Sequence, residues 1–94
     1  METDPYLELI KAQFDKILMV YETFSKLQPI IEFDVVDQKL YSFPANDYIA
    51  NLSPRTREPT RRQYVEATEK RQFLLFVKDT KNQRLRSYVF DLPD

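Results

Sequence analysis

The chemically most distinctive part of this sequence is a group of four arginines within eleven residues. The segment, SPRTREPTRRQ at 53–63, contains no apolar side chain other than its two prolines. Guanidinium groups bind phosphate and carboxylate oxygens through paired hydrogen bonds. The candidate anion-binding residues are therefore Arg55, Arg57, Arg61 and Arg62. We expect Arg61 and Arg62 to lie in the first turn of a helix, where backbone N–H groups also favour an anion.

The distribution of charge offers a second interpretation of the same arginines. Residues 1–53 carry four lysines and nine acidic residues, whereas residues 54–86 carry ten basic residues and four acidic ones. Because the whole chain has a net charge of only −1, the arginines can pair with the acidic half of the same chain or of a partner. Nucleic-acid or phosphate binding is therefore the alternative function rather than the first one. We see no helix-turn-helix pattern that would indicate specific DNA recognition.

Three residue types that enzymes commonly use are missing. Without cysteine and histidine, the chain has no thiolate nucleophile, no imidazole base and none of the usual zinc ligands. Without glycine, it cannot form a phosphate-binding loop, a dinucleotide fingerprint or a nucleophile elbow. Glu32 and Asp34 share a face of a predicted strand, but alternating acids are typical of its solvent side. We therefore predict a protein that is not an enzyme and has no cofactor and no metal site.

The N-terminal third predicts one amphipathic helix. Asp4 followed by Pro5 is typical of an N-cap and a first helical position, and Pro29 ends the helix. Between them, apolar residues recur at spacings of three and four, as one helical face requires. These residues are Leu7, Ile10, Phe14, Ile17, Tyr21 and Phe24.

Two β-hairpins are predicted, one on each side of the arginine-rich segment. In the first, Ile31 and Phe33 alternate with acidic residues, and a two-residue loop at Asp37 and Gln38 precedes residues 39–43. The second hairpin joins residues 71–79 to residues 84–92, with Asp79 opposite Arg84. Because the chain has no glycine, we expect every turn to use Asn, Asp, Pro or Ser.

The segment between the hairpins predicts two short helical pieces. Residues 44–52 are expected to form a helical turn capped by Asn46 or Asp47. Pro54 and Pro59 argue against a continuous helix through residues 53–63. We therefore expect the arginine-rich segment to be a linker, followed by a second helix that starts at Pro59.

Together these elements predict an α+β fold with the order αββαββ in a single domain, residues 1–94. The hairpins form one four-stranded antiparallel sheet, and the N-terminal amphipathic helix and the second helix cover one face. The other face is then uncovered, although the second hairpin is apolar on both sides. Aromatic residues and an arginine, a composition typical of interfaces, gather there. The candidate interface residues are Tyr41, Phe43, Arg86, Tyr88 and Phe90.

We interpret this second sheet face as a protein interface, most simply between two copies of the chain. Two other interpretations stay open, namely that residues 44–58 fold across it, or that it stacks the bases of single-stranded nucleic acid or a planar ligand. The sequence thus predicts a small binding or regulatory module that acts through protein–protein interaction, with itself or another protein. No apolar run could span a bilayer and the N-terminus is acidic, so we expect a cytoplasmic protein with no membrane partner.

Overall fold

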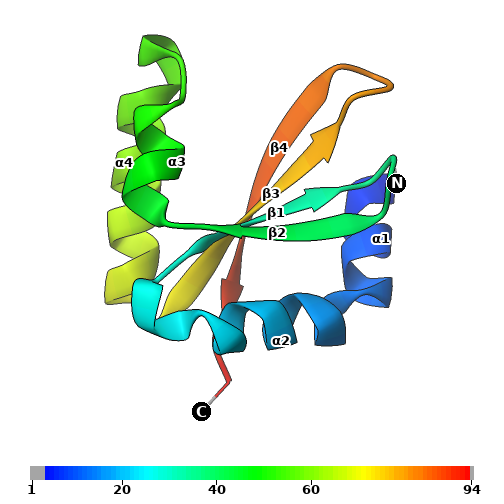
Figure 1. Cartoon of the computed structure of the whole chain (residues 1–94), viewed down its shortest axis with the longest axis horizontal. Helices are drawn as coiled ribbons and strands as arrows, with labels where there is room; N and C mark the ends of the chain where they lie inside the picture. The colour runs from blue at the N-terminus through cyan, green and yellow to red at the C-terminus, as the bar shows by residue number, and fades with distance from the viewer. Residues whose placement is uncertain (1–3, 94) are drawn as a thin grey trace.

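The computed structural model describes residues 4–93, which form two successive units, each of two helices followed by a β-hairpin (Figure 1). The first unit contains α1 (Pro5–Ala12), α2 (Phe14–Thr23), a 3₁₀ turn (Ser25–Leu27), β1 (Ile30–Asp34) and β2 (Lys39–Phe43). The second unit contains α3 (Ala45–Ala50), α4 (Pro54–Glu69), β3 (Gln72–Asp79) and β4 (Arg84–Asp91). The α+β fold is confirmed, with two helices before the first hairpin instead of the predicted one.

The strands of the described residues form one sheet in the order β2-β1-β3-β4. Each hairpin is antiparallel, but the central strands β1 and β3 run parallel, with Ile31 beside Leu75 and Phe33 beside Val77. The prediction of a wholly antiparallel sheet is therefore wrong. The connection between the hairpins, residues 44–71, contains α3 and α4. It is long enough to return the chain to the end of the sheet where β1 starts, as a parallel pairing requires.

The helices cover both faces of the sheet, so the prediction that they share one face is also wrong. α1 and α2 pack on the face that carries Ile31, Leu75 and Val77, whereas α3 and α4 pack on the face that carries Leu74 and Phe76 (Figure 1). Successive residues of a strand point to opposite faces, and residues 73–77 are all buried. A strand that is apolar on both sides requires cover on both sides. β3 therefore accounts for the placement of the helices.

The predicted N-terminal helix is divided at Gln13, whose backbone (φ −110°, ψ 9°) leaves the helical region. Asp4 caps α1 as predicted, because its side chain accepts hydrogen bonds from the first backbone N–H groups. The division turns α2 away from the direction of α1 (Figure 1), and Ile10 of α1 and Ile17 of α2 both reach the same core. Phe24 lies beyond the end of α2 and is exposed rather than inward.

The arginine-rich segment is helical, which corrects the predicted linker. α4 begins at Pro54 and continues through Pro59 to Glu69. Pro54 occupies the first helical position, where no backbone N–H is needed. Pro59 removes only the hydrogen bond that its own N–H would give to the carbonyl of Arg55. The two prolines therefore mark the start of α4 and one local defect, and they do not interrupt it.

α3 forms within the segment that was predicted to make a helical turn. Its N-cap is Pro44, without a capping side chain, so the prediction of a cap by Asn46 or Asp47 is wrong. Ile49 is buried in the core between α3 and the sheet, and Tyr48 packs at its edge. This short helix therefore starts the cover of the second sheet face that α4 completes.

The turns differ from the prediction in their length and in the residue types that form them. Both hairpins close through four-residue turns, 35–38 and 80–83, so the predicted two-residue loop is wrong, while the pairing of Asp79 with Arg84 is confirmed. Within residues 4–93, left-handed backbone with φ between 46° and 56° occurs at Gln28, Gln38, Arg71 and Gln83. Glycine normally takes such positions because it has no Cβ. Glutamine and arginine thus occupy them here, contrary to the expectation that Asn, Asp, Pro or Ser form every turn.

The two units are related by an approximate two-fold rotation about an axis that runs between β1 and β3, along the strands. This rotation preserves the parallel direction of β1 and β3, exchanges β2 with β4, and carries α1 and α2 to the face where α3 and α4 lie. Gln28 and Arg71 occupy equivalent positions, in the left-handed backbone just before the two central strands. Tyr21 and Tyr64 are equivalent on the preceding helices. The units meet along the β1–β3 pairing, and both also contribute residues at the end of the sheet where these strands start.

Candidate functional sites

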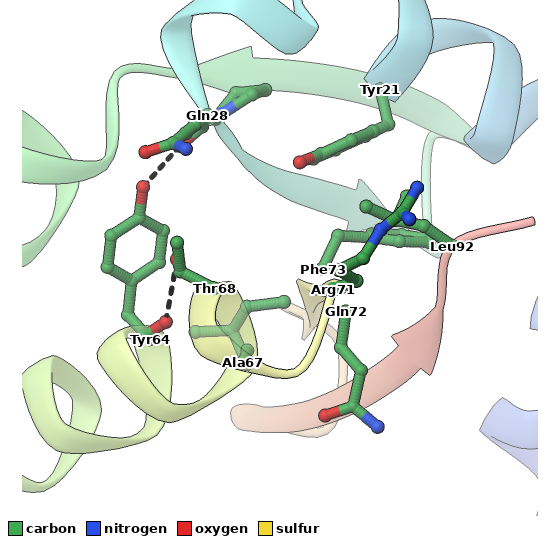
Figure 2. A pocket seen from close by; sticks show the side chains of 11 residues that line it. Tyr21, Gln28, Tyr64, Ala67, Thr68, Arg71, Gln72, Phe73 and Leu92 are labelled. Carbon is green, nitrogen blue, oxygen red and sulfur yellow. Dashed lines mark hydrogen bonds between the residues drawn. The ribbon is translucent and has the colours of Figure 1, made fainter. Parts of the chain in front are cut away.

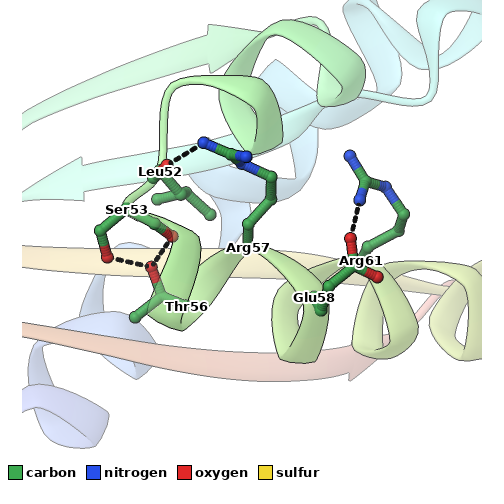
Figure 3. A network of polar contacts seen from close by, with 6 residues as sticks. All are labelled: Leu52, Ser53, Thr56, Arg57, Glu58 and Arg61. Atoms are coloured by element: carbon green, nitrogen blue, oxygen red, sulfur yellow. Dashed lines mark hydrogen bonds and ion pairs between the residues drawn. The ribbon is translucent and has the colours of Figure 1, made fainter.

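The arginine-rich segment is a polar network on the first half of α4 (Figure 3). The Arg57 guanidinium donates a hydrogen bond of 3.0 Å to the backbone carbonyl of Leu52, and Arg61 pairs with Glu58. Arg57 Nε is buried and has no hydrogen-bond partner among the residues that the structure describes. Since α4 begins at Pro54, the expectation that Arg61 lies in a first helical turn is wrong. The first turn holds the other two candidate arginines, Arg55 and Arg57.

The charges of α4 are balanced locally. Arg61 pairs with Glu58, and Lys70 pairs with Glu66 at 2.7 Å, in both cases within one turn of the helix. The third ion pair of residues 4–93, Lys11 with Glu8, lies within α1. These pairs are all exposed, so water and salt screen them and they contribute little to stability. Within residues 4–93, the arginines of α4 form no ion pair with the acidic first half of the same chain, which the charge distribution had suggested.

The five candidate interface residues lie on two different faces of the sheet. Tyr41 and Phe43 lie on the α3–α4 side, where the two rings stack with centroids 6.1 Å apart. The other three lie on β4, and their side chains point to the α1–α2 side. Tyr88 donates a 2.6 Å hydrogen bond to Asp4, and Phe90 meets Phe14 edge-to-face at 5.3 Å. The five residues therefore do not form one surface.

The outer edge of β4 is the longest open strand edge of the sheet. β4 has eight residues, and β2, the other edge strand, has five. Every residue of β4 pairs with β3 in one unbroken register. Residues 84–87 are exposed, and the Leu85 side chain is 46% exposed. β2 starts with Lys39 and is followed directly by Pro44, and both residue types protect an edge from pairing. β4 contains no lysine, proline or bulge.

A group of hydrogen-bonded polar side chains connects α1 to the turn of the second hairpin. The Tyr6 hydroxyl donates a 2.5 Å hydrogen bond to Asp79, which is only 4% exposed. The Asp79 carboxylate also accepts hydrogen bonds from the backbone and side chain of Asn82. The bond from Tyr6, more than those from Asn82, holds the pKa of Asp79 below its ordinary value. The hydrogen bond from Tyr6 to Asp79 joins residues that are far apart in sequence, so no local sequence pattern predicts it.

The carboxylate pair considered for acid–base chemistry has structural roles. Glu32 accepts a 2.9 Å hydrogen bond from the Tyr48 hydroxyl, and burial together with this bond raises the pKa of Tyr48. Asp34 accepts hydrogen bonds from the backbone N–H groups of Val36 and Asp37 and so closes the first hairpin turn. Each carboxylate is thus occupied by its own neighbours. No cluster of three or more potential metal ligands occurs within residues 4–93.

A cavity of about 170 Å³ lies where the two units meet, at the start of the central strands (Figure 2). The equivalent residues of the two units contribute to its wall in pairs, Tyr21 with Tyr64 and Gln28 with Arg71. The Tyr64 hydroxyl donates a 2.7 Å hydrogen bond to the backbone carbonyl of Gln28. Burial raises the pKa of both tyrosines, so both are neutral hydrogen-bond donors near neutral pH.

Sequence reasoning missed this cavity. It assigned Tyr21 to the apolar face of a helix and counted Arg71 only as part of the basic half. The sequence does contain one sign that the two units are similar. In both hairpins an aspartate precedes the turn, and the last two turn residues are Asp or Asn followed by Gln. The two segments are DVVDQK at 34–39 and DTKNQR at 79–84.

Comparisons with known proteins found no family model that matches the sequence, and no significantly similar curated protein or solved structure. Among the described residues, no helix combines the length and apolar character that crossing a bilayer demands.

Proposed function

We propose that this protein is a small binding module that acts by associating with a second copy of itself through the outer edge of β4. The observation that carries the proposal is this edge, an eight-residue strand paired on one side only, without proline or bulge. The outward backbone groups of an edge strand are available to another strand. Two antiparallel β4 strands would join two four-stranded sheets into one continuous sheet.

The side chains of β4 are complementary to themselves when the strand pairs with its copy about Ser87. Residues directly opposite each other then lie on the same face of the joined sheet. The opposing pairs are Leu85 with Val89, Arg86 with Tyr88, and Arg84 with Phe90. The exposed Leu85 gains an apolar partner, and each arginine meets an aromatic ring rather than a like charge. Pairing about Arg86 would instead place two guanidinium groups opposite each other, which disfavours that register.

The proposal keeps the predicted homodimer but changes its surface. Helices cover both sheet faces, so the predicted face-to-face association has no open apolar face to use. Arg86, Tyr88 and Phe90 remain interface residues because they belong to β4. Tyr41 and Phe43 belong to the opposite edge of the sheet and are outside the proposed interface.

The test is the solution mass of the protein and of variants at Ser87, measured by light scattering on a sizing column. The wild type is expected to have twice the chain mass of 11.3 kDa. Ser87 is exposed, and in the proposed register it faces its own copy. Ser87→Lys therefore places two like charges opposite each other and should give a monomer. Ser42→Lys, on the other edge strand β2, is the matched control and should leave the dimer intact.

The salt dependence separates this interface from one built on α4. Backbone pairing and the contact of Leu85 with Val89 are insensitive to salt, so the dimer should persist at high ionic strength. A dimer that forms only at low salt would instead place the α4 arginines in the contact. A wild-type monomer, or equal loss of the dimer in Ser42→Lys and Ser87→Lys, would contradict the proposal.

A further inference from the structure

We propose that the cavity between the two units binds a small carboxylate whose apolar part is about the size of a benzene ring. The cavity lies where the central strands start (Figure 2), and its residues differ from those that carry the proposed β4 interface. A ligand there would touch both units of the fold at once.

The Tyr21 side chain is only 8% exposed and contributes to the cavity wall. Its ring stacks on Phe73 with centroids 4.9 Å apart, and this contact fixes the direction of the hydroxyl. Within residues 4–93, the Tyr21 hydroxyl forms no hydrogen bond, whereas the equivalent Tyr64 hydroxyl is bound to the Gln28 carbonyl. The hydroxyl is not among the fully buried polar atoms of the described residues, so it is accessible and free to donate. A ligand oxygen in the cavity would accept this hydrogen bond in place of water.

The charge of the wall favours an anion. Among the described residues that line the cavity, Arg71 is the one charged residue and none is acidic. The carbonyl end of α4 carries a partial negative charge near the same place, so selectivity for an anion depends on the Arg71 guanidinium. Arg71 also holds left-handed backbone with φ 56°, a position where glycine would be more stable. Arginine at this strained position is consistent with a role for its side chain.

The size of the cavity and the apolar part of its wall limit the ligand. Pro29, Ala67, Phe73 and Leu92 contribute apolar surface beside the polar groups. A cavity of about 150 Å³ lined by apolar residues accommodates benzene, and this one measures about 170 Å³. An aromatic or branched aliphatic carboxylate therefore matches its volume and its mixture of polar and apolar lining.

The test is a titration of the ¹⁵N-labelled protein with sodium benzoate, followed by amide chemical shifts, with benzamide as the uncharged control. Benzoate should shift the amides of residues 28 and 71–73, and benzamide should bind much more weakly. Tyr21→Phe removes only the hydroxyl and should raise the Kd for benzoate at least about tenfold, as expected for a hydrogen bond to a charged group.

Arg71→Gly separates binding from folding. It removes the cation and also relieves the left-handed backbone, so this variant should be more stable yet bind benzoate at least about tenfold more weakly. Gln83→Gly relieves the same backbone strain at the far hairpin turn and should bind as the wild type does. Absence of benzoate shifts at the cavity, equal binding of benzamide, or unchanged affinity in Tyr21→Phe and Arg71→Gly would overturn the proposal.

Discussion

Replacing Gln38 or Gln83 with glycine should stabilise this protein, although glycine ordinarily weakens a fold. Both residues end a four-residue hairpin turn and have φ 55°. Both side chains are exposed and form no hydrogen bond within residues 4–93. The substitution therefore removes no contact that holds the turn, and its effect comes from the backbone alone.

The magnitude follows from two opposing terms. Left-handed backbone costs a residue with a Cβ about 1–2 kcal/mol, and glycine avoids this cost. Glycine loses about 0.5–1 kcal/mol more conformational free energy on folding. The net gain in the free energy of unfolding is therefore about 0.5–1 kcal/mol for each substitution. For a domain of this size, that gain raises the Tm by roughly 2–8 °C.

The assay is thermal and urea unfolding followed by circular dichroism, with Lys16→Gly as the matched control. Lys16 is exposed within α2, where the backbone is helical, so glycine there should lower the free energy of unfolding by roughly 0.5–1 kcal/mol. The reasoning is refuted if Gln38→Gly and Gln83→Gly lower the Tm as the control does.

Three further predictions concern pH and α4. A hydrogen bond from Tyr88 holds the pKa of Asp4 below its ordinary range, and one from Tyr6 does the same for Asp79. The stability that these two carboxylates contribute is therefore complete above about pH 4. It is lost as the pH falls through their pKa values in the folded protein. Urea midpoints measured from pH 6 to pH 2 should show this loss, and Tyr88→Phe should reduce it. Burial raises the pKa of Tyr88 to about 12, so its contribution to stability is complete below about pH 10 and is lost as the pH rises through 12. Several tyrosines have raised pKa values, so tyrosinate absorbance should show a late-titrating fraction that Tyr88→Phe reduces by one residue. Pro59→Ala restores a backbone N–H donor inside α4 and should raise the free energy of unfolding by about 1–2 kcal/mol, measured by urea unfolding. An unchanged or lower free energy of unfolding would show that Pro59 does not destabilise the helix.

Local signals in the sequence predicted much of the fold. Asp4 with Pro5 marks the start of α1, and the alternation through residues 73–90 gives the second hairpin its register. These predictions succeeded because caps and strand pairing depend on residues that are close in sequence. Two-sided burial of β3 was also visible, but it was interpreted as an open face instead of a requirement for helices on both sides.

The errors came from interactions between distant segments. The parallel pairing of β1 with β3 depends on the path of residues 44–71, which periodicity does not encode. α4 continues through Pro59 because the surrounding helix and its packing on β3 outweigh one missing hydrogen bond. The Tyr21 and Arg71 side chains meet at one cavity only because the two units are related by an approximate two-fold axis.

Mixing two oppositely charged variants tests self-association through β4 most directly. Ser87→Lys and Ser87→Glu should each be monomeric alone, because like charges face each other at the centre of the interface. An equimolar mixture places lysine opposite glutamate, so light scattering should report a species of twice the chain mass of 11.3 kDa. A mixture that stays monomeric, while the wild type is a dimer, would show that β4 does not pair about Ser87.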